Sequence, residues 1–125
     1  MIVDNHADLG LSPVKKKVLL YTEWFASYNL EMLEGIFDED IKWTLVGDEA
    51  IVGKENFINA LADMKENKAT HLTINRIINH GKQASVDGVM HMSTGNSYAF
   101  ADFYEFSNLK ASSIKSITSY IMQLK

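Results

Sequence analysis

Apolar residues in the first half of the chain recur at helical spacing. Ser12 and Pro13 supply a helix N-cap and a proline for the first turn, and the apolar positions between Val14 and Tyr28 are three or four residues apart. Asn29 can cap a second, short helix that ends before the acidic residues 38–40, which we expect to form a turn. A third apolar stripe with helical spacing covers residues 57–64. The pattern therefore predicts three helices.

The second half of the chain changes to an alternation of apolar and polar residues, which predicts strands. A first strand is expected earlier, at residues 41–45, and the remaining strands are separated by turn residues such as glycine, asparagine and serine. The expected strands of this half are residues 71–78, 83–94, 97–107 and 114–124. Three helices followed by a long antiparallel sheet predict an α+β fold, with the helices packed on one face of a curved sheet. Residues 1–12 are expected to be a loose leader, and residues 13–125 a single domain.

An aspartate interrupts the most apolar of these strands. In residues 98–106, a period of two places Asp102 on one face with two tyrosines and two phenylalanines. Burial of an unpaired ionised carboxylate costs several kcal/mol, so Asp102 is expected to be neutral, to be paired, or to line a cavity. It is a candidate catalytic acid or base, and the alternative is a buried carboxylate with a purely structural role.

His91 is the second candidate for acid–base chemistry. If Gly95 and Asn96 form a two-residue hairpin turn, His91 lies opposite Phe100 and diagonally next to Asp102, on the same face. Such a pair would orient one imidazole tautomer and make His91 a general base near neutral pH. A bulge of one residue would move His91 to the other face, where it would be a partly exposed strand residue.

Four local motifs, in the same order along the chain, resemble those of the NTF2-like superfamily and of its SnoaL-like proteins. Residues 29–33 are similar to the family pattern D-L-E-x-L, residues 37–43 to F-x-x-D-V-x-W, residues 52–57 to x-G-R-E-A-I, and residues 102–106 to D-x-F-x-F. The resemblance covers nearly the whole chain from Pro13. It implies a cystatin-like cone whose apolar interior holds a small molecule, and dimers that form through the outer sheet face.

The superfamily includes polyketide cyclases and ketosteroid isomerases, so the resemblance also implies roles for single residues. Tyr21 matches the tyrosine that donates a hydrogen bond to the substrate oxygen in the isomerases, and Asp102 matches their protonated acid. Their aspartate base is missing, because its position falls on Leu45 or Thr44. Arg76 is likewise without the two aspartates that accompany an arginine in the epoxide hydrolases of the superfamily. Tyr21 can alternatively be a core aromatic residue whose hydroxyl donates to a carbonyl.

Four aromatic residues are candidates for the wall of a ligand cavity: Trp24, Trp43, Phe100 and Tyr104. Aromatic walls favour flat, apolar ligands, although the same residues can belong to the core. Met90 and Met92, together with alanines and a phenylalanine of the next strand, make the opposite sheet face apolar as well. Since helices can cover only one face, we expect the other to meet a second subunit in a homodimer.

Composition excludes several other functions. The net charge is −4, and Arg76 is the single arginine, so nucleic acid is an improbable partner. The chain lacks cysteine, which removes thiolate chemistry and disulfides. No apolar run is long enough to span a membrane, and the first residues do not form a secretory signal, so a cytoplasmic protein is expected. His6, His71 and His80 are not at the spacing of metal ligands, and neither a metal nor another cofactor is predicted.

The sequence thus leaves two main hypotheses. In the first, the protein binds a small apolar or polycyclic molecule and catalyses a cofactor-independent isomerase-like or cyclase-like proton transfer, with Asp102, His91 and Tyr21 as catalytic residues. In the second, the same fold serves as a non-catalytic ligand carrier or as a dimeric interaction module. A third hypothesis, a scaffold for a partner protein, would require an exposed apolar patch that remains after dimerisation.

Overall fold

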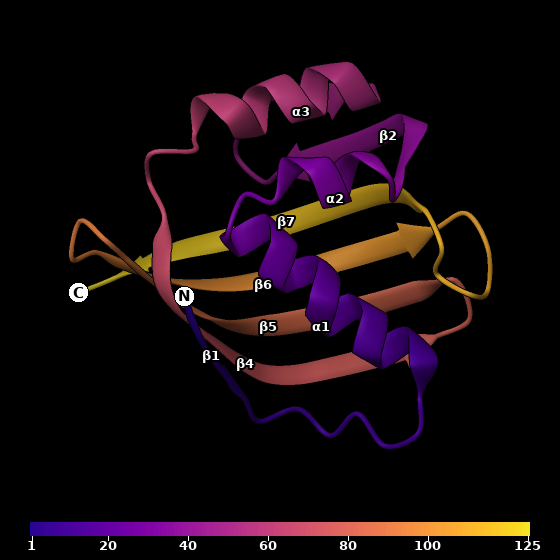
Figure 1. The fold of residues 1–125 in the computed structure, drawn as a ribbon, viewed down its shortest axis with the longest axis horizontal. Helices are drawn as coiled ribbons and strands as arrows, with labels where there is room; N and C mark the ends of the chain where they lie inside the picture. The colour runs from indigo at the N-terminus through magenta and orange to yellow at the C-terminus, as the bar shows by residue number, and fades with distance from the viewer.

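The computed structural model describes all of residues 1–125 and contains three helices and seven strands (Figure 1). The helices and strands are bounded as follows: β1 (Ile2–Asn5), α1 (Pro13–Ala26), α2 (Leu30–Glu34), β2 (Phe37–Leu45), β3 (Ile51–Val52), α3 (Lys54–Asp63), β4 (Ala69–His80), β5 (Gln83–Met92), β6 (Ser97–Phe106) and β7 (Ile114–Leu124). This order confirms the predicted α+β fold with three helices that precede the main sheet.

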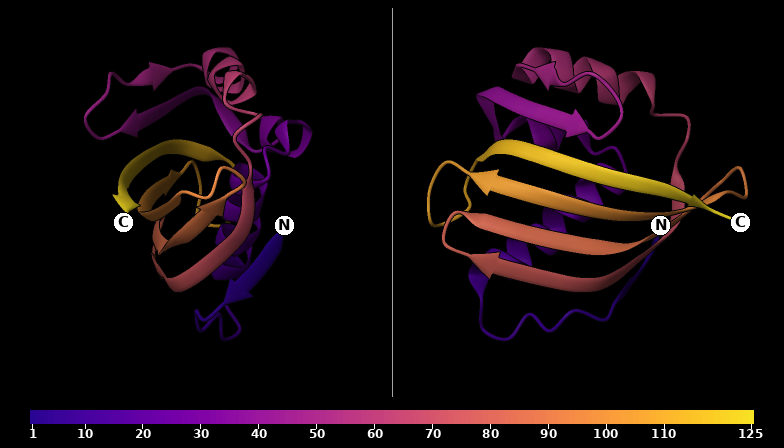
Figure 2. Two further views of the ribbon diagram at one scale, coloured as in Figure 1. Left: turned by 90° about the vertical axis from the view of Figure 1, so that its left-hand side faces the viewer. Right: turned by 180° about the vertical axis from the view of Figure 1, so that it is seen from behind.

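All seven strands form one curved sheet in the order β1-β4-β5-β6-β7-β2-β3. The pairs from β4 through β7 are antiparallel, whereas β1 is parallel to β4 and β2 is parallel to β7. The long helix α1 crosses one face of the sheet, and α3 lies over β2 (Figure 1). Seen from behind, strands β4 to β7 carry no helix on their other face (Figure 2). We call the helix-covered face the inner face and the uncovered face the outer face.

Besides the short strand β3, for which no strand was expected, two segments differ from the sequence prediction. Ile2–Asn5, within the leader that was expected to be loose, pair with β4 as a parallel edge strand. The acidic residues 38–40, expected to form a turn, lie inside β2, which begins at Phe37. In both cases the strand is held by a partner that is far away in the sequence, so local residue preferences do not reveal it.

The ends of α1 are fixed by local hydrogen bonds. The Ser12 side chain accepts a hydrogen bond from the backbone N–H of Lys15, as the N-cap prediction requires. At the other end, the N–H of Asn29 donates to the carbonyl of Trp24, which closes a Schellman motif around Tyr28. Tyr28 has a φ of 53°, in the left-handed region where glycine is usual, and a non-glycine residue there costs about 1–2 kcal/mol.

Sheet curvature depends on Gly88 in the middle of β5. The β4–β5 register shifts between Ile74 and Arg76, which marks a bulge opposite Gly88. A Cβ atom on Gly88 would overlap the carbonyl oxygen of Thr73 and press on the ring of Phe100. Only glycine therefore allows β4 to approach this closely and bend the sheet around the helices.

An aromatic stack fills one end of the space between the sheet and the helices. The rings of Phe37 and Trp43 lie on the ring of Phe57, with centroid distances of 4.6 and 4.8 Å, and Phe25 stacks on Phe37 at 5.7 Å. These side chains join α1 and α3 to β2. The stack makes this end of the molecule a solid core.

Candidate functional site: an apolar cavity with one carboxylic acid

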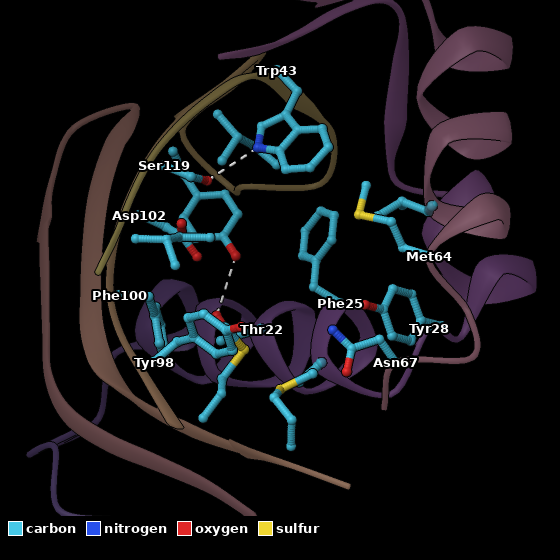
Figure 3. Close-up of a pocket in the computed structure, with 17 residues that line it drawn as sticks. Thr22, Phe25, Tyr28, Trp43, Met64, Asn67, Tyr98, Phe100, Asp102 and Ser119 are labelled. Carbon is cyan, nitrogen blue, oxygen red and sulfur yellow. Dashed lines mark hydrogen bonds between the residues drawn. The ribbon is translucent and has the colours of Figure 1, made fainter. Parts of the chain in front are cut away.

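A cavity of about 240 Å³ lies between the inner face of the sheet and the C-terminal ends of α1 and α3 (Figure 3). Thirteen of its 17 lining residues are hydrophobic. The lining comprises Thr22, Phe25, Ala26, Tyr28, Trp43, Leu61, Met64, Asn67, Met90, Met92, Tyr98, Phe100, Asp102, Tyr104, Ile117, Ser119 and Ile121. An apolar chamber with a few polar groups has the character of a small-molecule site.

Asp102 lies on the inner face of β6 and lines this cavity, while its backbone pairs with Ser119 of β7. Burial among apolar side chains disfavours the ionised form and raises the pKa of Asp102 from 3.8 to about 6, and a hydrogen bond with the Ser119 side chain opposes this effect. No positively charged side chain lines the cavity. Asp102 is therefore a carboxylic acid that gains and loses its proton close to neutral pH.

Trp43 orients the hydroxyl group that meets Asp102. Its indole Nε1–H donates to the Ser119 Oγ atom at 3.1 Å (Figure 3). Because the indole can only donate, the Ser119 oxygen acts as the acceptor and the Ser119 proton stays free for the carboxylate. The indole thus holds the Ser119 hydroxyl in place on β7, opposite Asp102 on β6.

Tyr104, the next inner-face residue of β6, is only 2% exposed. Its hydroxyl lies 3.2 Å from the Thr22 Oγ1 atom, and Thr22 donates its own proton to the carbonyl of Val18 at 2.8 Å. Tyr104 must therefore donate to Thr22. Burial and the nearby Asp102 carboxylate raise the pKa of Tyr104 far above its ordinary value, so this phenol stays neutral and its proton is already in use.

Three further polar side chains line the cavity without a hydrogen bond to any protein group: Tyr28, Asn67 and Tyr98. Tyr28 comes from the strained end of α1, Asn67 follows α3, and Tyr98 is near the start of β6. Each offers at least one proton to a ligand. They are the available donors for a ligand oxygen, in contrast to Tyr104.

No group of three or more His, Asp or Glu side chains is arranged to hold a metal ion. No helix of the protein is long and apolar enough to cross a membrane.

Comparison with protein families matches residues 18–114 to the SnoaL-like domain, which is about three quarters of the chain. The chain belongs to the SnoaL-like family. No protein of curated function matches the sequence. The motif resemblance at residues 29–33, 37–43, 52–57 and 102–106 therefore identified the family correctly.

Solved structures show that this SnoaL-like domain has the NTF2-like fold. An NTF2-like protein of unknown function from Cytophaga hutchinsonii is 22% identical, with a TM-score of 0.68, over 86% of this chain and 98% of that chain. A putative ketosteroid isomerase from Kribbella flavida is 16% identical, with a TM-score of 0.74, over 90% and 80%. An LEH-like epoxide hydrolase from M. tuberculosis is 14% identical, with a TM-score of 0.75, over 89% and 84%. At these identities the similarity establishes the fold alone, and it confirms the predicted NTF2-like cone.

The predicted pair of His91 and Asp102 does not form in this SnoaL-like domain. His91 pairs with Ser97, not with Phe100, because the β5–β6 loop spans residues 93–96 instead of two residues. The pairing partner of His91 thus shifts by three residues, and a shift by an odd number of residues moves a side chain to the other face. His91 therefore lies on the exposed outer face, where its Nδ1 atom is 2.7 Å from the Ser97 Oγ atom. Met90 and Met92 move in the opposite sense, from the predicted outer face into the cavity lining.

Tyr21 and Trp24 also lie outside the cavity. The Tyr21 hydroxyl donates to the carbonyl of Ala111 at 2.7 Å, and the Trp24 ring packs against Tyr21 at a centroid distance of 5.5 Å. Successive residues of a helix point about 100° apart, so when Thr22 faces the cavity, Tyr21 points about 100° and Trp24 about 200° away from it. Tyr21 therefore has the core role that was its alternative, and Trp24 is not a wall residue.

Trp43, Phe100 and Tyr104 do line the cavity, as does Asp102. Sequence reasoning missed Ser119, Thr22, Tyr28, Tyr98 and Asn67 as site residues. For Tyr98 a signal existed, because it alternates on the same face as Asp102. Ser119 follows only from the β6–β7 register, which places it opposite Asp102.

Proposed function

We propose that this SnoaL-like domain binds a small, largely apolar molecule in its cavity and that Asp102 exchanges a proton with it. The proposal depends on one observation: Asp102 is the single carboxylic acid among the lining residues, and its pKa is about 6. A carboxyl group with that pKa is about nine-tenths ionised at pH 7, which suits a general base. The Asp102 carboxylate is thus the proposed catalytic base.

Cavity volume limits the size of the ligand. A cavity of about 150 Å³ holds a benzene molecule, so 240 Å³ encloses a compound of about ten non-hydrogen atoms. A four-ring polycyclic compound, one of the ligand types that the family suggests, would extend out of the cavity. We therefore favour monocyclic or bicyclic ligands.

The proposed reaction is the isomerisation of a β,γ-unsaturated ketone to its α,β-unsaturated isomer. The Asp102 carboxylate would remove a proton from the carbon between the carbonyl and the double bond and return it to the γ carbon, so one carboxyl group serves both steps. Negative charge would develop on the ketone oxygen between the two steps. Tyr28, Tyr98 and Asn67 carry the protons that are free to stabilise it.

The test uses 3-cyclohexenone, which fits the cavity volume, and follows its conversion to 2-cyclohexenone by ultraviolet absorbance. We expect the rate constant to rise as pH increases through about 6 and then to level off, because the base must be ionised. Asp102→Asn should lower the rate at least a hundredfold. Glu105→Gln is the matched control, since Glu105 is on the same strand but outside the cavity and pairs with Lys115. Equal rates for wild type and Asp102→Asn would exclude proton transfer by Asp102.

A non-catalytic ligand carrier is the second candidate function. The position of His91 favours this function. His91 lies on the outer face, so Asp102 has no imidazole beside it in the cavity to act as a second acid or base. In that case 3-cyclohexenone would bind, as detected by chemical-shift changes of the lining residues, but would not be converted. Binding without conversion therefore selects the carrier function, and absence of both excludes a ligand of this kind.

We also propose that the outer face mediates homodimerisation. Large apolar side chains are exposed there, among them Phe103 and Tyr120 at 51%, Ile78 at 61% and Met122 at 67%. Strand register places them in adjacent rows of β4, β6 and β7, and the Phe103 and Tyr120 rings pack edge to face at 5.9 Å. A second copy offers the same apolar surface, which a two-fold axis makes self-complementary.

Sedimentation equilibrium tests this interface. Wild type should have the mass of a dimer, whereas Phe103→Glu should be a folded monomer, because a charge in the middle of an apolar interface cannot be solvated. Leu109→Glu is the control: Leu109 is also exposed, at 66%, but lies in the β6–β7 connection. A monomeric wild type, or a dimeric Phe103→Glu variant, would contradict the proposed interface.

A further inference from the structure

The cavity carries one negative charge and nothing in its lining to neutralise it. None of the 17 lining residues is a lysine, arginine or histidine, and the polar partner of Asp102 is the uncharged Ser119 hydroxyl. The single arginine of the protein, Arg76, is already paired with Asp87 through two hydrogen bonds of 2.8 and 3.1 Å. The ionised Asp102 carboxylate is therefore without a cationic partner inside an apolar chamber, which is an unfavourable state for the free protein.

Ligand charge determines whether binding relieves or worsens this state. An anionic ligand would place a second negative charge in a cavity that has no cation, so carboxylates and phosphates are disfavoured. A neutral ligand excludes water from the carboxylate without replacing the lost solvation. A cationic ligand supplies the missing counter-charge, and its attraction to Asp102 is strengthened because apolar side chains surround the pair.

The cavity walls favour the same ligand charge. Six of the lining residues are aromatic: Phe25, Tyr28, Trp43, Tyr98, Phe100 and Tyr104. The faces of aromatic rings carry partial negative charge and attract ammonium groups, and this attraction is strongest where water is excluded. The aromatic and aliphatic surface also suits an apolar ligand body. Walls and carboxylate thus both select a molecule with an apolar body and one positive charge.

We propose that the natural ligand is a small apolar amine, bound as the ammonium ion, with its nitrogen paired to the Asp102 carboxylate and its hydrocarbon part against the aromatic walls. This inference rests on the proposed function only for the statement that the cavity binds a small molecule, and it applies to the carrier function, because a carboxylate paired with an ammonium ion is not available to remove a proton from carbon. It specifies the charge of that molecule, which the family and the fold leave open. The free hydroxyl and amide groups of Tyr28, Tyr98 and Asn67 would then contact a further polar substituent of the amine.

The test compares three probes of one shape: cyclohexylmethylamine, cyclohexylmethanol and cyclohexanecarboxylate. Calorimetric titration at about pH 8, where the amine is protonated and Asp102 is ionised, should show the amine binding at least tenfold more tightly than the alcohol. The carboxylate should bind more weakly than either. As pH falls below about 6, Asp102 takes up a proton and the preference for the amine should disappear.

Variants separate this inference from the proposed function. Asp102→Asn should bind amine and alcohol with equal affinity, whereas Glu105→Gln should keep the preference of wild type. If the alcohol binds wild type as tightly as the amine does, or if Asp102→Asn keeps the preference for the amine, the amine inference is wrong while a small-molecule cavity remains. If no probe changes the chemical shifts of the lining residues, both the inference and the proposed cavity function are overturned.

Discussion

Replacement of Asp102 by asparagine should make the protein more stable at neutral pH, although it removes a group of the proposed site. Asparagine has nearly the same shape, its side-chain oxygen can accept the Ser119 proton, and its amide can be solvated from the cavity. What the substitution removes is the negative charge, whose burial raises the pKa of Asp102 from 3.8 to about 6. The substitution therefore isolates the cost of holding that charge in the cavity.

The size of the effect follows from linkage between protonation and folding. Each pKa unit corresponds to about 1.4 kcal/mol, so the ionised carboxylate destabilises the folded state by at most about 3 kcal/mol. Water that enters the open cavity reduces this figure, and we expect about 2 kcal/mol. Since the folded-state pKa is the higher one, wild type loses this stability as pH rises from about 4 to about 6 and loses no more above that range.

Urea-induced unfolding, followed by tryptophan fluorescence at intervals from about pH 4 to about pH 8, measures the difference between the two proteins. The stabilities should be nearly equal at pH 4, and Asp102→Asn should be about 2 kcal/mol more stable at pH 8. Glu105→Gln should show no such pH-dependent gain, because the Glu105 side chain is 43% exposed to water and is paired with Lys115. A less stable Asp102→Asn variant at pH 8, or a difference that does not vary with pH, would refute the reasoning.

Three other substitutions test the supporting structure. Ser119→Ala should raise the pKa of Asp102 above about 6, because the Ser119 hydroxyl favours the ionised form. A carbon-13 NMR titration that gives an unchanged or lower pKa would contradict this role of Ser119. Gly88→Ala should lower the free energy of unfolding by more than about 3 kcal/mol, because the added methyl group meets the Thr73 carbonyl. Gly35→Ala is the control: the added methyl group has room there, so the free energy of unfolding should change by less than about 0.5 kcal/mol. Similar values for the two variants would disprove the close strand approach. Tyr28→Gly should be more stable than Tyr28→Ala by about 1 kcal/mol, since only glycine avoids the left-handed strain, and equal denaturation midpoints would argue against that strain.

The sequence by itself determined the three helices, five of the seven strands, the α+β class and the family. Helical periodicity and the caps at Ser12 and Asn29 are local properties, and the structure has both caps with their hydrogen bonds. Alternation along β6 likewise put Asp102 on the same face as Tyr98, Phe100 and Tyr104, since the period of two is a property of the strand alone. A carboxylate among aromatic residues was therefore visible before any strand pairing was known.

Only the tertiary structure decided which other residues meet that carboxylate. The length of one hairpin loop, residues 93–96, exchanged the two faces of β5, so that Met90 entered the cavity and His91 left it. The β6–β7 register brought Ser119 to Asp102, and the rotation of α1 turned Thr22 toward the cavity and Tyr21 away from it into the core. Strand register and helix rotation depend on contacts between segments that are distant in sequence, whereas periodicity is a property of each segment alone. For this reason the sequence revealed the acid but not its surroundings.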